Sequence, residues 1–189
     1  NKIRGEAIPK PGIKSKAEAD KILEDLKGSE FIVSKIESKE EKRVPAPPFI
    51  TSTLQQEAFK KLRFSSKQTM MLAQQLYEGI ELGRVGATGL ITYMRTDSTN
   101  LSDEALWLAK EAIIDLFGEK YWAGFPRKYK VKSRLAQEAH EAVRPTDPTR
   151  TPESVRGHLT PQQYRLYDLI WRRFMATQMK EAVFDTMSV

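Results

Sequence analysis

The chain has 189 residues, no cysteine, two histidines and a formal net charge of +6, a length that suffices for one compact domain or for one domain with part of another. Without cysteine there is no disulfide, thiolate metal site or cysteine nucleophile, and two histidines argue against an all-protein zinc site. No apolar run approaches the roughly 20 residues that span a bilayer, so we expect a soluble intracellular protein with a mild preference for a polyanionic partner.

The N-terminal quarter is predicted to contain little regular structure. Residues 1–14, with two prolines, indicate an extended segment without a regular element. Ser15 and Glu18 are spaced as a capping box and predict a short amphipathic helix that ends near Gly28. β-Branched and aromatic residues predict a strand over 31–38, and the charged residues that follow indicate a solvated run.

A proline cluster and the chain ends suggest how the chain is divided. The prolines within residues 45–48 remove backbone hydrogen-bond donors, so we place the first boundary there. The chain begins with Asn1 rather than methionine, and residues 184–189 resemble a strand that stops while still apolar. We therefore expect a piece of a longer protein.

Between the proline cluster and the final strand, the sequence predicts helices, because capping residues recur ahead of apolar faces with helical spacing. The expected N-caps are Ser52, Ser65, Ser102 and Thr160. Glycines between residues 79 and 89 indicate a loop, and residues 90–95 indicate a short strand. In the last helix the aromatic side chains are interpreted as core packing rather than as platforms for bases. The expected core residues of that helix are Tyr167, Trp171, Phe174 and Met175.

Residues 89–100, Gly-Leu-Ile-Thr-Tyr-Met-Arg-Thr-Asp-Ser-Thr-Asn, carry the first candidate site. If the segment is extended, the period of two places Tyr93, Arg95 and Asp97 on one face together with Ile91. A tyrosine attacks phosphorus only where loss of its proton is tolerated, and a nearby arginine helps this while its fork matches two phosphate oxygens. The alternative is a strand-to-helix turn in which Asp97 caps backbone groups.

A second candidate segment spans residues 137–146. On a helix, His140 and Arg144 lie four residues apart and share a face, and Pro145 ends or kinks that helix. A histidine and an arginine together can hold the oxygens of one phosphate. The alternative is a surface helix in which Glu141 pairs with neighbouring cations.

A third segment, residues 121–134, is basic and aromatic and contains no acidic residue. Its cations are Arg127, Lys128, Lys130, Lys132 and Arg134. Charge for the backbone and rings for the bases are what a groove for single-stranded nucleic acid uses. An equally weighted alternative is a flexible surface loop.

Four sequence runs together resemble the type IA DNA topoisomerases, in their bacterial branch. The runs cover residues 47–58, 89–100, 137–147 and 166–171 with 178–179, in the order of the family. The resemblance implies a mainly α fold, namely a helical, winged-helix/CAP-like domain with short β elements, flanked by strands of a β-rich arch domain. It implies the partial arch over residues 1–52, the helical tyrosine domain over 53–179 and a return strand over 180–189.

The resemblance also implies roles for individual residues. Tyr93 matches the nucleophile that forms a 5′-phosphotyrosyl link with single-stranded DNA, and Arg95 and His140 match residues that contact the scissile phosphate. Asp97 and Arg144 match supporting positions. The family relaxes negatively supercoiled DNA by cleavage, strand passage and religation without ATP, which is consistent with the absence of a phosphate-loop motif.

The family's magnesium ion is bound by a Toprim domain whose acidic cluster is not in this sequence. The resemblance therefore implies Mg²⁺ outside this chain, a chain that is inactive alone, and DNA and the remaining domains of the same polypeptide as partners. It implies a cytoplasmic, nucleoid-associated protein.

Other readings of the sequence remain open. One is a non-catalytic helical module that binds single-stranded DNA. A tyrosine recombinase or type IB topoisomerase is disfavoured, because those families place the tyrosine after the histidine and arginines, whereas Tyr93 precedes His140. A purely structural domain is disfavoured by the four matching runs.

Overall fold

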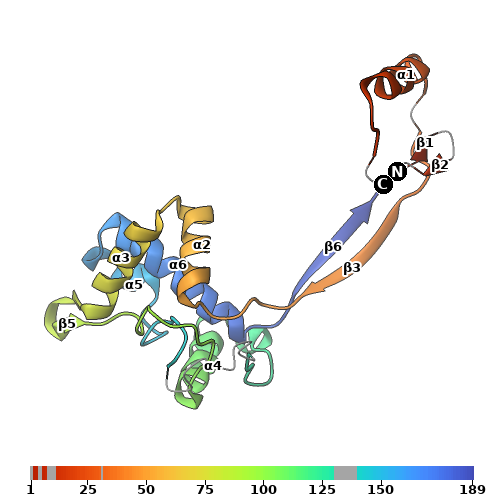
Figure 1. The fold of residues 1–189 in the computed structure, drawn as a ribbon. Coiled ribbons are helices and arrows are strands. Elements are labelled where there is room, and N and C mark those ends of the chain that lie inside the picture. The colour runs from red at the N-terminus through yellow and green to blue at the C-terminus, as the bar shows by residue number, and fades with distance from the viewer. Residues whose placement is uncertain (1, 4–5, 8–11, 31, 130–139) are drawn as a thin grey trace. The chain divides into compact units, whose positions relative to one another are not determined.

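The computed structural model describes residues 2–3, 6–7, 12–30, 32–129 and 140–189, and the fold is mainly α (Figure 1). The helices are α1 Lys16–Leu26, α2 Thr51–Leu62, α3 Ser66–Glu78, α4 Asp103–Phe117, α5 Pro152–Val155 and α6 Pro161–Gln178. The strands are β1 Lys2–Ile3, β2 Glu6–Ala7, β3 Glu37–Arg43, β4 Ile80–Glu81, β5 Ala87–Thr88 and β6 Ala182–Ser188. Short 3₁₀ turns lie at Gly83–Val85, Glu119–Tyr121 and Arg156–His158. None of the helices in the described ranges is long and apolar enough to cross a membrane.

The chain divides into two compact units, one of residues 1–40 with 185–189 and one of residues 41–184. The first unit contains α1, whose N-cap Ser15 accepts a hydrogen bond from the Glu18 backbone, as predicted. None of the residues of α1 is buried. The family domain boundaries expected near residues 52 and 180 stay a prediction.

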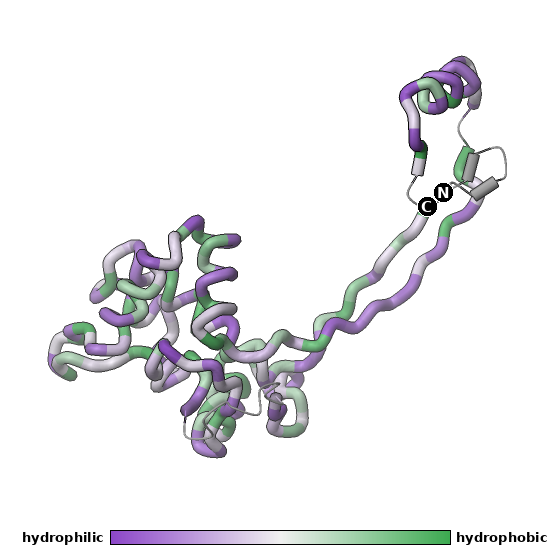
Figure 2. The backbone as a smooth tube through the Cα atoms, viewed as in Figure 1, coloured by the Kyte–Doolittle hydropathy of each residue, from purple (hydrophilic) through white to green (hydrophobic). Residues whose placement is uncertain are grey.

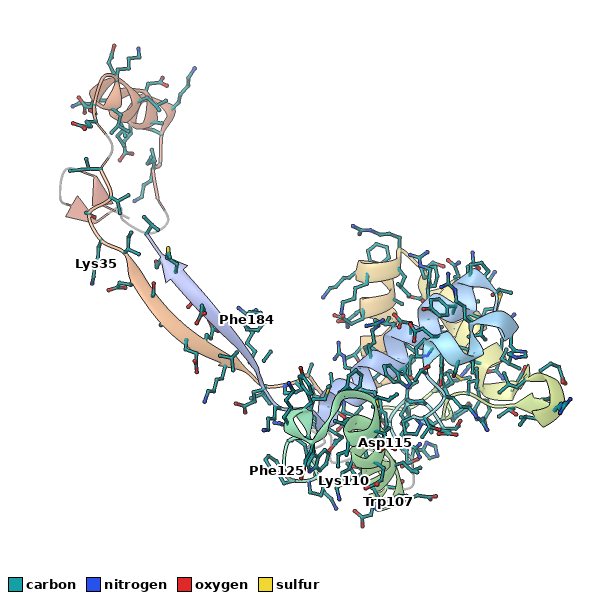
Figure 3. All side chains as sticks on the ribbon, turned by 180° about the vertical axis from the view of Figure 1, so that it is seen from behind. Lys35, Trp107, Lys110, Asp115, Phe125 and Phe184 are labelled. Carbon is teal, nitrogen blue, oxygen red and sulfur yellow. The ribbon has the colours of Figure 1, made fainter. Side chains whose placement is uncertain are left out.

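The core of the second unit is built around α6, which packs against α2, α3, α4 and α5. The predicted core residues of this helix are confirmed, since Tyr167 and Phe174 are fully buried and Trp171 and Met175 are nearly so. Each large apolar side chain removed from water stabilises the fold by roughly 1.5–3 kcal/mol. Figure 2 shows the hydrophobic and hydrophilic residues alternating along these helices, as amphipathic packing requires. On α4, the opposite side carries exposed residues such as Trp107 and Asp115 (Figure 3).

Three of the four predicted helix starts in the second unit are confirmed. The side chains of Ser65, Ser102 and Thr160 each accept a hydrogen bond from the backbone three residues ahead. The expected N-cap at Ser52 is wrong, because α2 begins two residues earlier than that cap implies, at Thr51 with Ile50 as its cap. There the Thr53 hydroxyl accepts from the Ile50 backbone N–H at 3.0 Å.

The strands differ more from the sequence prediction. The strand predicted over 31–38 is wrong for residues 32–36, and residue 31 lies outside the described residues. Its last two residues belong to β3, which the charged run 37–43 forms and which pairs with β6. The side chains of these two paired strands are almost all exposed, so neither strand needs apolar residues to cover a core. Residues expected to lack regular structure also pair, since β1 joins β2 and β4 joins β5 in antiparallel hairpins.

Candidate active site around Tyr93, Arg95 and His140

The tyrosine segment, residues 89–100, is extended but is not a regular strand. A single antiparallel bridge joins Ile91 to Pro145, so the strand predicted over 90–95 does not form. The predicted face holds for its three polar members, because the side chains of Tyr93, Arg95 and Asp97 are exposed while the residues between them are buried. It does not hold for Ile91, which is 1% exposed and belongs to the core.

The tyrosine segment begins with a close backbone contact to the end of α3. The Leu90 N–H donates to the Leu76 carbonyl at 2.7 Å. A Cβ atom at Gly89 would lie 2.6 Å from the Tyr77 carbonyl oxygen, so only glycine fits there. This contact brings Tyr93 next to α3, where its ring meets the Tyr77 ring edge-on at a centroid distance of 5.4 Å. The Tyr93 side chain remains 43% exposed and accessible to a substrate.

Arg95 and His140 line the same open cavity of about 520 Å³. Asp97 also lines it, together with residues at the start of α2. Tyr93 is not among the lining residues, although it lies two positions from Arg95 in the extended segment. Arg95 and Asp97 both lie among the described residues, and no ion pair joins them.

The helix predicted over 137–145 is not present in its described part. Residues 137–139 lie outside the described residues, and residues 140–146 form no helix but make isolated antiparallel bridges at Val143 and Pro145. Their backbone groups bond to distant segments instead of to the preceding turn: Ala142 N–H donates to the Asn100 carbonyl at 2.9 Å and Val143 N–H to the Phe49 carbonyl at 2.8 Å. Long-range pairing therefore overrides the local helical spacing.

Because this segment is not helical, His140 and Arg144 do not share a helical face. His140 is exposed, whereas the Arg144 side chain is 11% exposed and pairs with Glu141 at 2.5 Å. A second guanidinium nitrogen of Arg144 donates to the Pro145 carbonyl at 2.9 Å. The anticipated pairing of Glu141 with a neighbouring cation is observed, and Arg144 is placed as a structural group rather than on the cavity.

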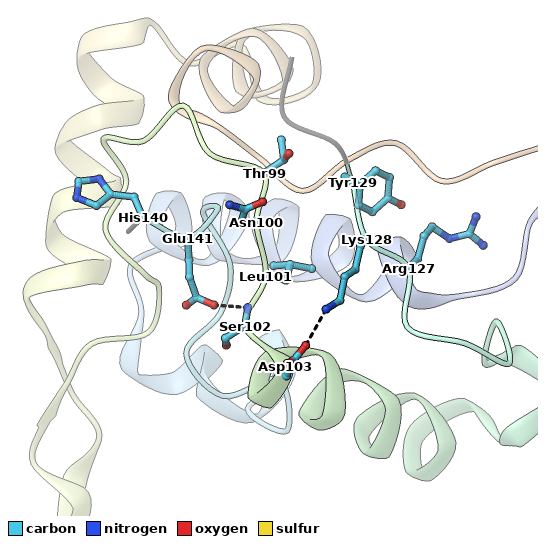
Figure 4. A pocket seen from close by; sticks show the side chains of 10 residues that line it. All are labelled: Thr99, Asn100, Leu101, Ser102, Asp103, Arg127, Lys128, Tyr129, His140 and Glu141. Carbon is cyan, nitrogen blue, oxygen red and sulfur yellow. Dashed lines mark hydrogen bonds and ion pairs between the residues drawn. The ribbon is translucent and has the colours of Figure 1, made fainter. Parts of the chain in front are cut away.

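Glu141 joins the His140 segment to the start of α4. Its second carboxylate oxygen accepts the Ser102 backbone N–H at 2.7 Å, a donor left free at a helix start (Figure 4). Burial raises the pKa of Glu141, but the hydrogen bonds from Arg144 and Ser102 outweigh this and hold the pKa below its ordinary value. Glu141 is therefore charged at neutral pH.

A second cavity of about 410 Å³ also has His140 among its lining residues (Figure 4). Its lining combines residues 99–103 and 127–129 with His140 and Glu141. Lys128 pairs with the Asp103 carboxylate at 2.9 Å, and both side chains are well exposed. His140 thus faces two adjacent cavities, one with Arg95 and one with Lys128.

The described end of the basic segment is held against the end of α6. The Arg127 guanidinium donates to the Met179 carbonyl at 3.3 Å. The Gln178 side-chain amide accepts the Arg127 backbone N–H and donates to the Arg127 carbonyl. The Tyr129 hydroxyl lies 3.2 Å from the carbonyl oxygens of Pro45 and Thr177, and burial raises the pKa of this phenol. The other predicted DNA-binding cations lie outside the described residues. They are Lys130, Lys132 and Arg134.

Two threonines without a role in the sequence prediction join the tyrosine segment to distant parts of the chain: Thr51 from outside the segment and Thr92 from within it. The Thr51 hydroxyl bonds to the backbone on both sides of Arg95, and the Thr92 hydroxyl bonds to the segment that carries Arg144. No spacing rule reveals such contacts, because the partners are 43 to 52 residues apart.

Comparisons with known proteins show the family to which the chain belongs. Residues 2–189 match the DNA topoisomerase family, and the chain belongs to it. Within that family it is a bacterial type IA topoisomerase sequence, similar to the full-length topoisomerase I of Thermotoga maritima, with 42% sequence identity and a TM-score of 0.72. The match covers 88% of this chain and 26% of the Thermotoga chain.

Family membership implies a magnesium ion, which carboxylates usually hold. Among the residues that the structure describes, no group of three or more acidic or histidine side chains is placed to bind a metal. Asp97 is the single carboxylate among the lining residues of the Arg95–His140 cavity. The described residues therefore do not fit the ion by themselves.

Proposed function

We propose that this chain is the tyrosine-bearing part of a type IA topoisomerase that relaxes negatively supercoiled DNA without ATP in the bacterial cytoplasm. The Tyr93 phenol loses its proton as its oxygen attacks a DNA phosphorus, the bond from phosphorus to the 3′ oxygen breaks, and that oxygen takes up a proton, so that no net proton is gained. The 5′-phosphotyrosyl link keeps the phosphodiester energy, so the reverse attack by the 3′ hydroxyl reseals the strand after passage of the other strand.

The observation that carries this proposal is the cavity shared by Arg95 and His140 beside an exposed Tyr93. A guanidinium fork matches two phosphate oxygens and offsets the charge that builds up as phosphorus is attacked. An imidazole at the same cavity donates a further hydrogen bond to the phosphate. Asp97 takes a supporting role among the residues that line the cavity. Its negative charge repels a phosphate that does not lie against Arg95.

Arg144 and the basic segment take secondary roles in this proposal. Arg144 acts through Glu141, which holds the His140 segment to α4. Lys128 contacts the DNA backbone in the cavity beside His140, where its ion pair with Asp103 is exposed and easily exchanged. Arg127 supports this surface from the end of α6, and Lys130, Lys132 and Arg134 extend the same basic run.

The rest of the active site belongs to the remaining domains of the polypeptide. We assign residues 53–179 to the helical tyrosine domain and residues 1–52 and 180–189 to the arch. Magnesium binding belongs to the Toprim domain, and it supplies charge stabilisation at the cleaved phosphate.

The test is Tyr93→Phe in the full-length enzyme, with a labelled single-stranded oligonucleotide and Mg²⁺. We expect loss of the denaturation-resistant adduct and of relaxation, with unchanged DNA affinity, because only the attacking oxygen is removed. Peptide mapping of the wild-type adduct should locate the phosphodiester on Tyr93. A covalent complex formed by the variant would place the nucleophile elsewhere.

The same material distinguishes a non-catalytic DNA-binding module. Such a module would bind single-stranded DNA with the usual salt dependence, would be indifferent to alanine at Tyr93 and Arg95, and would form no adduct in the full-length protein.

A further inference from the structure

The first of the two threonines, Thr51, lies at the start of α2 and clamps the backbone around Arg95. Its hydroxyl donates to the Met94 carbonyl at 2.8 Å, and the Thr96 carbonyl oxygen lies 3.0 Å from the same hydroxyl oxygen. The same oxygen accepts the Thr96 backbone N–H at 2.9 Å, and the Thr51 N–H donates to the Thr96 carbonyl at 2.9 Å. Polar groups on both sides of Arg95 are thus tied to one helix end.

The second threonine, Thr92, clamps the backbone on the other side of Tyr93. Its hydroxyl donates to the Ala142 carbonyl at 2.7 Å and accepts the Arg144 backbone N–H at 3.0 Å. Its own N–H donates to the Arg144 carbonyl at 2.9 Å. These bonds join the residue before Tyr93 to the chain that begins at His140.

Tyr93 and Arg95 depend on these backbone hydrogen bonds because their own side chains make few contacts that would fix their direction. The Tyr93 ring has one aromatic neighbour, Tyr77, and the Arg95 side chain makes no hydrogen bond or ion pair within the described residues. Both side chains project from a segment that forms no sheet among the described residues. Its one β-pairing there is the isolated bridge between Ile91 and Pro145. Their direction is therefore set by the backbone of residues 92–96.

We propose that Thr51 and Thr92 are positioning residues, which fix the backbone of residues 92–96 so that Tyr93 and Arg95 meet the same phosphate as His140. This inference rests on the proposed nucleophilic role of Tyr93. Thr92 sets the register between Tyr93 and the His140 segment, and Thr51 sets the direction of Arg95. A misplacement of about 1 Å at reacting atoms costs on the order of 100-fold in rate.

A threonine hydroxyl suits this task because it donates and accepts at once, whereas valine has the same shape without either function. Serine keeps the hydroxyl and loses only the methyl group. The pair of substitutions at each position therefore separates hydrogen bonding from packing.

The experiment uses the full-length enzyme with Thr51→Val, Thr51→Ser, Thr92→Val and Thr92→Ser, and Thr88→Val as the matched control. The Thr88 hydroxyl bonds locally to the Gly86 carbonyl at 3.1 Å, away from residues 92–96. Single-turnover cleavage and religation of an oligonucleotide are measured at saturating enzyme and Mg²⁺, with affinity from fluorescence anisotropy.

We expect both valine variants to slow cleavage and religation about 10- to 100-fold by the same factor, with affinity within twofold of wild type. The serine variants should recover to within about threefold, and Thr88→Val should match wild type. A variant that is partly unfolded would instead lower the amplitude of cleavage and leave its rate constant unchanged.

Wild-type rate constants in the valine variants, an amplitude loss alone, or serine variants as slow as valine would each overturn the inference. These results leave the proposed function intact if the wild-type adduct maps to Tyr93. An adduct on another residue would instead overturn the proposed function together with the inference.

Discussion

Arg63 is the single non-glycine residue with a positive φ in the described part of the chain. It follows the last residue of α2 with φ of 61°, and its N–H donates to the Phe59 carbonyl at 3.1 Å. The turn lets Phe64 enter the core, where the Arg165 guanidinium lies over its ring. A left-handed conformation costs a residue with a Cβ about 1 kcal/mol, and this tight helix connection accepts that cost.

We therefore expect Arg63→Gly to raise the free energy of unfolding by about 1 kcal/mol, because glycine adopts this conformation without strain. Urea unfolding followed by tryptophan fluorescence measures the change. Arg63→Ala retains the Cβ and should lie within about 0.5 kcal/mol of wild type. A glycine variant less stable than the alanine variant would show that the Arg63 side chain itself stabilises the turn.

At the scale of elements, the sequence predicted correctly most of the helix caps, which depend only on neighbouring residues. Ser65, Ser102 and Thr160 were identified as caps because a cap needs only the three residues that follow it. The same reasoning failed for 137–145, where helical spacing is present but the described residues hydrogen-bond to Asn100 and Phe49 instead. Such pairing depends on the fold and has no signature in the segment itself.

The Glu141 carboxylate links this segment to the start of α4. Its pKa is depressed, so the stabilisation is complete above the ordinary value of 4.5 and is lost as the pH falls through the lower value in the folded chain. Acid therefore weakens the bonds to Arg144 and Ser102 together, while neutral pH preserves them.

We expect Glu141→Gln to lower the free energy of unfolding by about 1–3 kcal/mol at pH 7, because the Arg144 guanidinium loses its charged partner. The difference from wild type should shrink as the pH falls below 4.5, where the wild-type carboxylate itself takes up a proton. Thermal melts at pH 7 and at pH 3–4 measure both effects. Glu153→Gln, on the exposed surface, is the control, and a difference independent of pH would contradict the charged role.

At the scale of the whole molecule, the candidate site joins three stretches of chain that sequence patterns could not place together. The period of two predicted that Tyr93, Arg95 and Asp97 share an exposed face, since it needs only an extended backbone. Nothing in the spacing required His140 to line the cavity of Arg95, and the family resemblance supplied that expectation. The Thr51 and Thr92 clamps arise from packing of distant segments and had no sequence signal.

The last prediction concerns what 189 residues can do alone. The chain matches 26% of the Thermotoga topoisomerase I, and cleavage requires a phosphate charge to be stabilised and a 3′ oxygen to be protonated. In the proposed function Arg95 and His140 would supply part of that stabilisation, but the described residues include no carboxylate cluster for Mg²⁺. We therefore expect the isolated chain, incubated with a labelled single-stranded oligonucleotide and Mg²⁺, to yield no denaturation-resistant adduct.

The full-length enzyme under the same conditions is the positive control, and a cooperative thermal melt shows that the isolated chain is folded. Weak, salt-sensitive binding of the oligonucleotide should persist, since the net charge of +6 and the exposed Lys128 are properties of this chain itself. An adduct mapped to Tyr93 in the isolated chain would mean that Arg95 and His140 suffice for cleavage. The remaining domains would then serve strand passage rather than bond breaking.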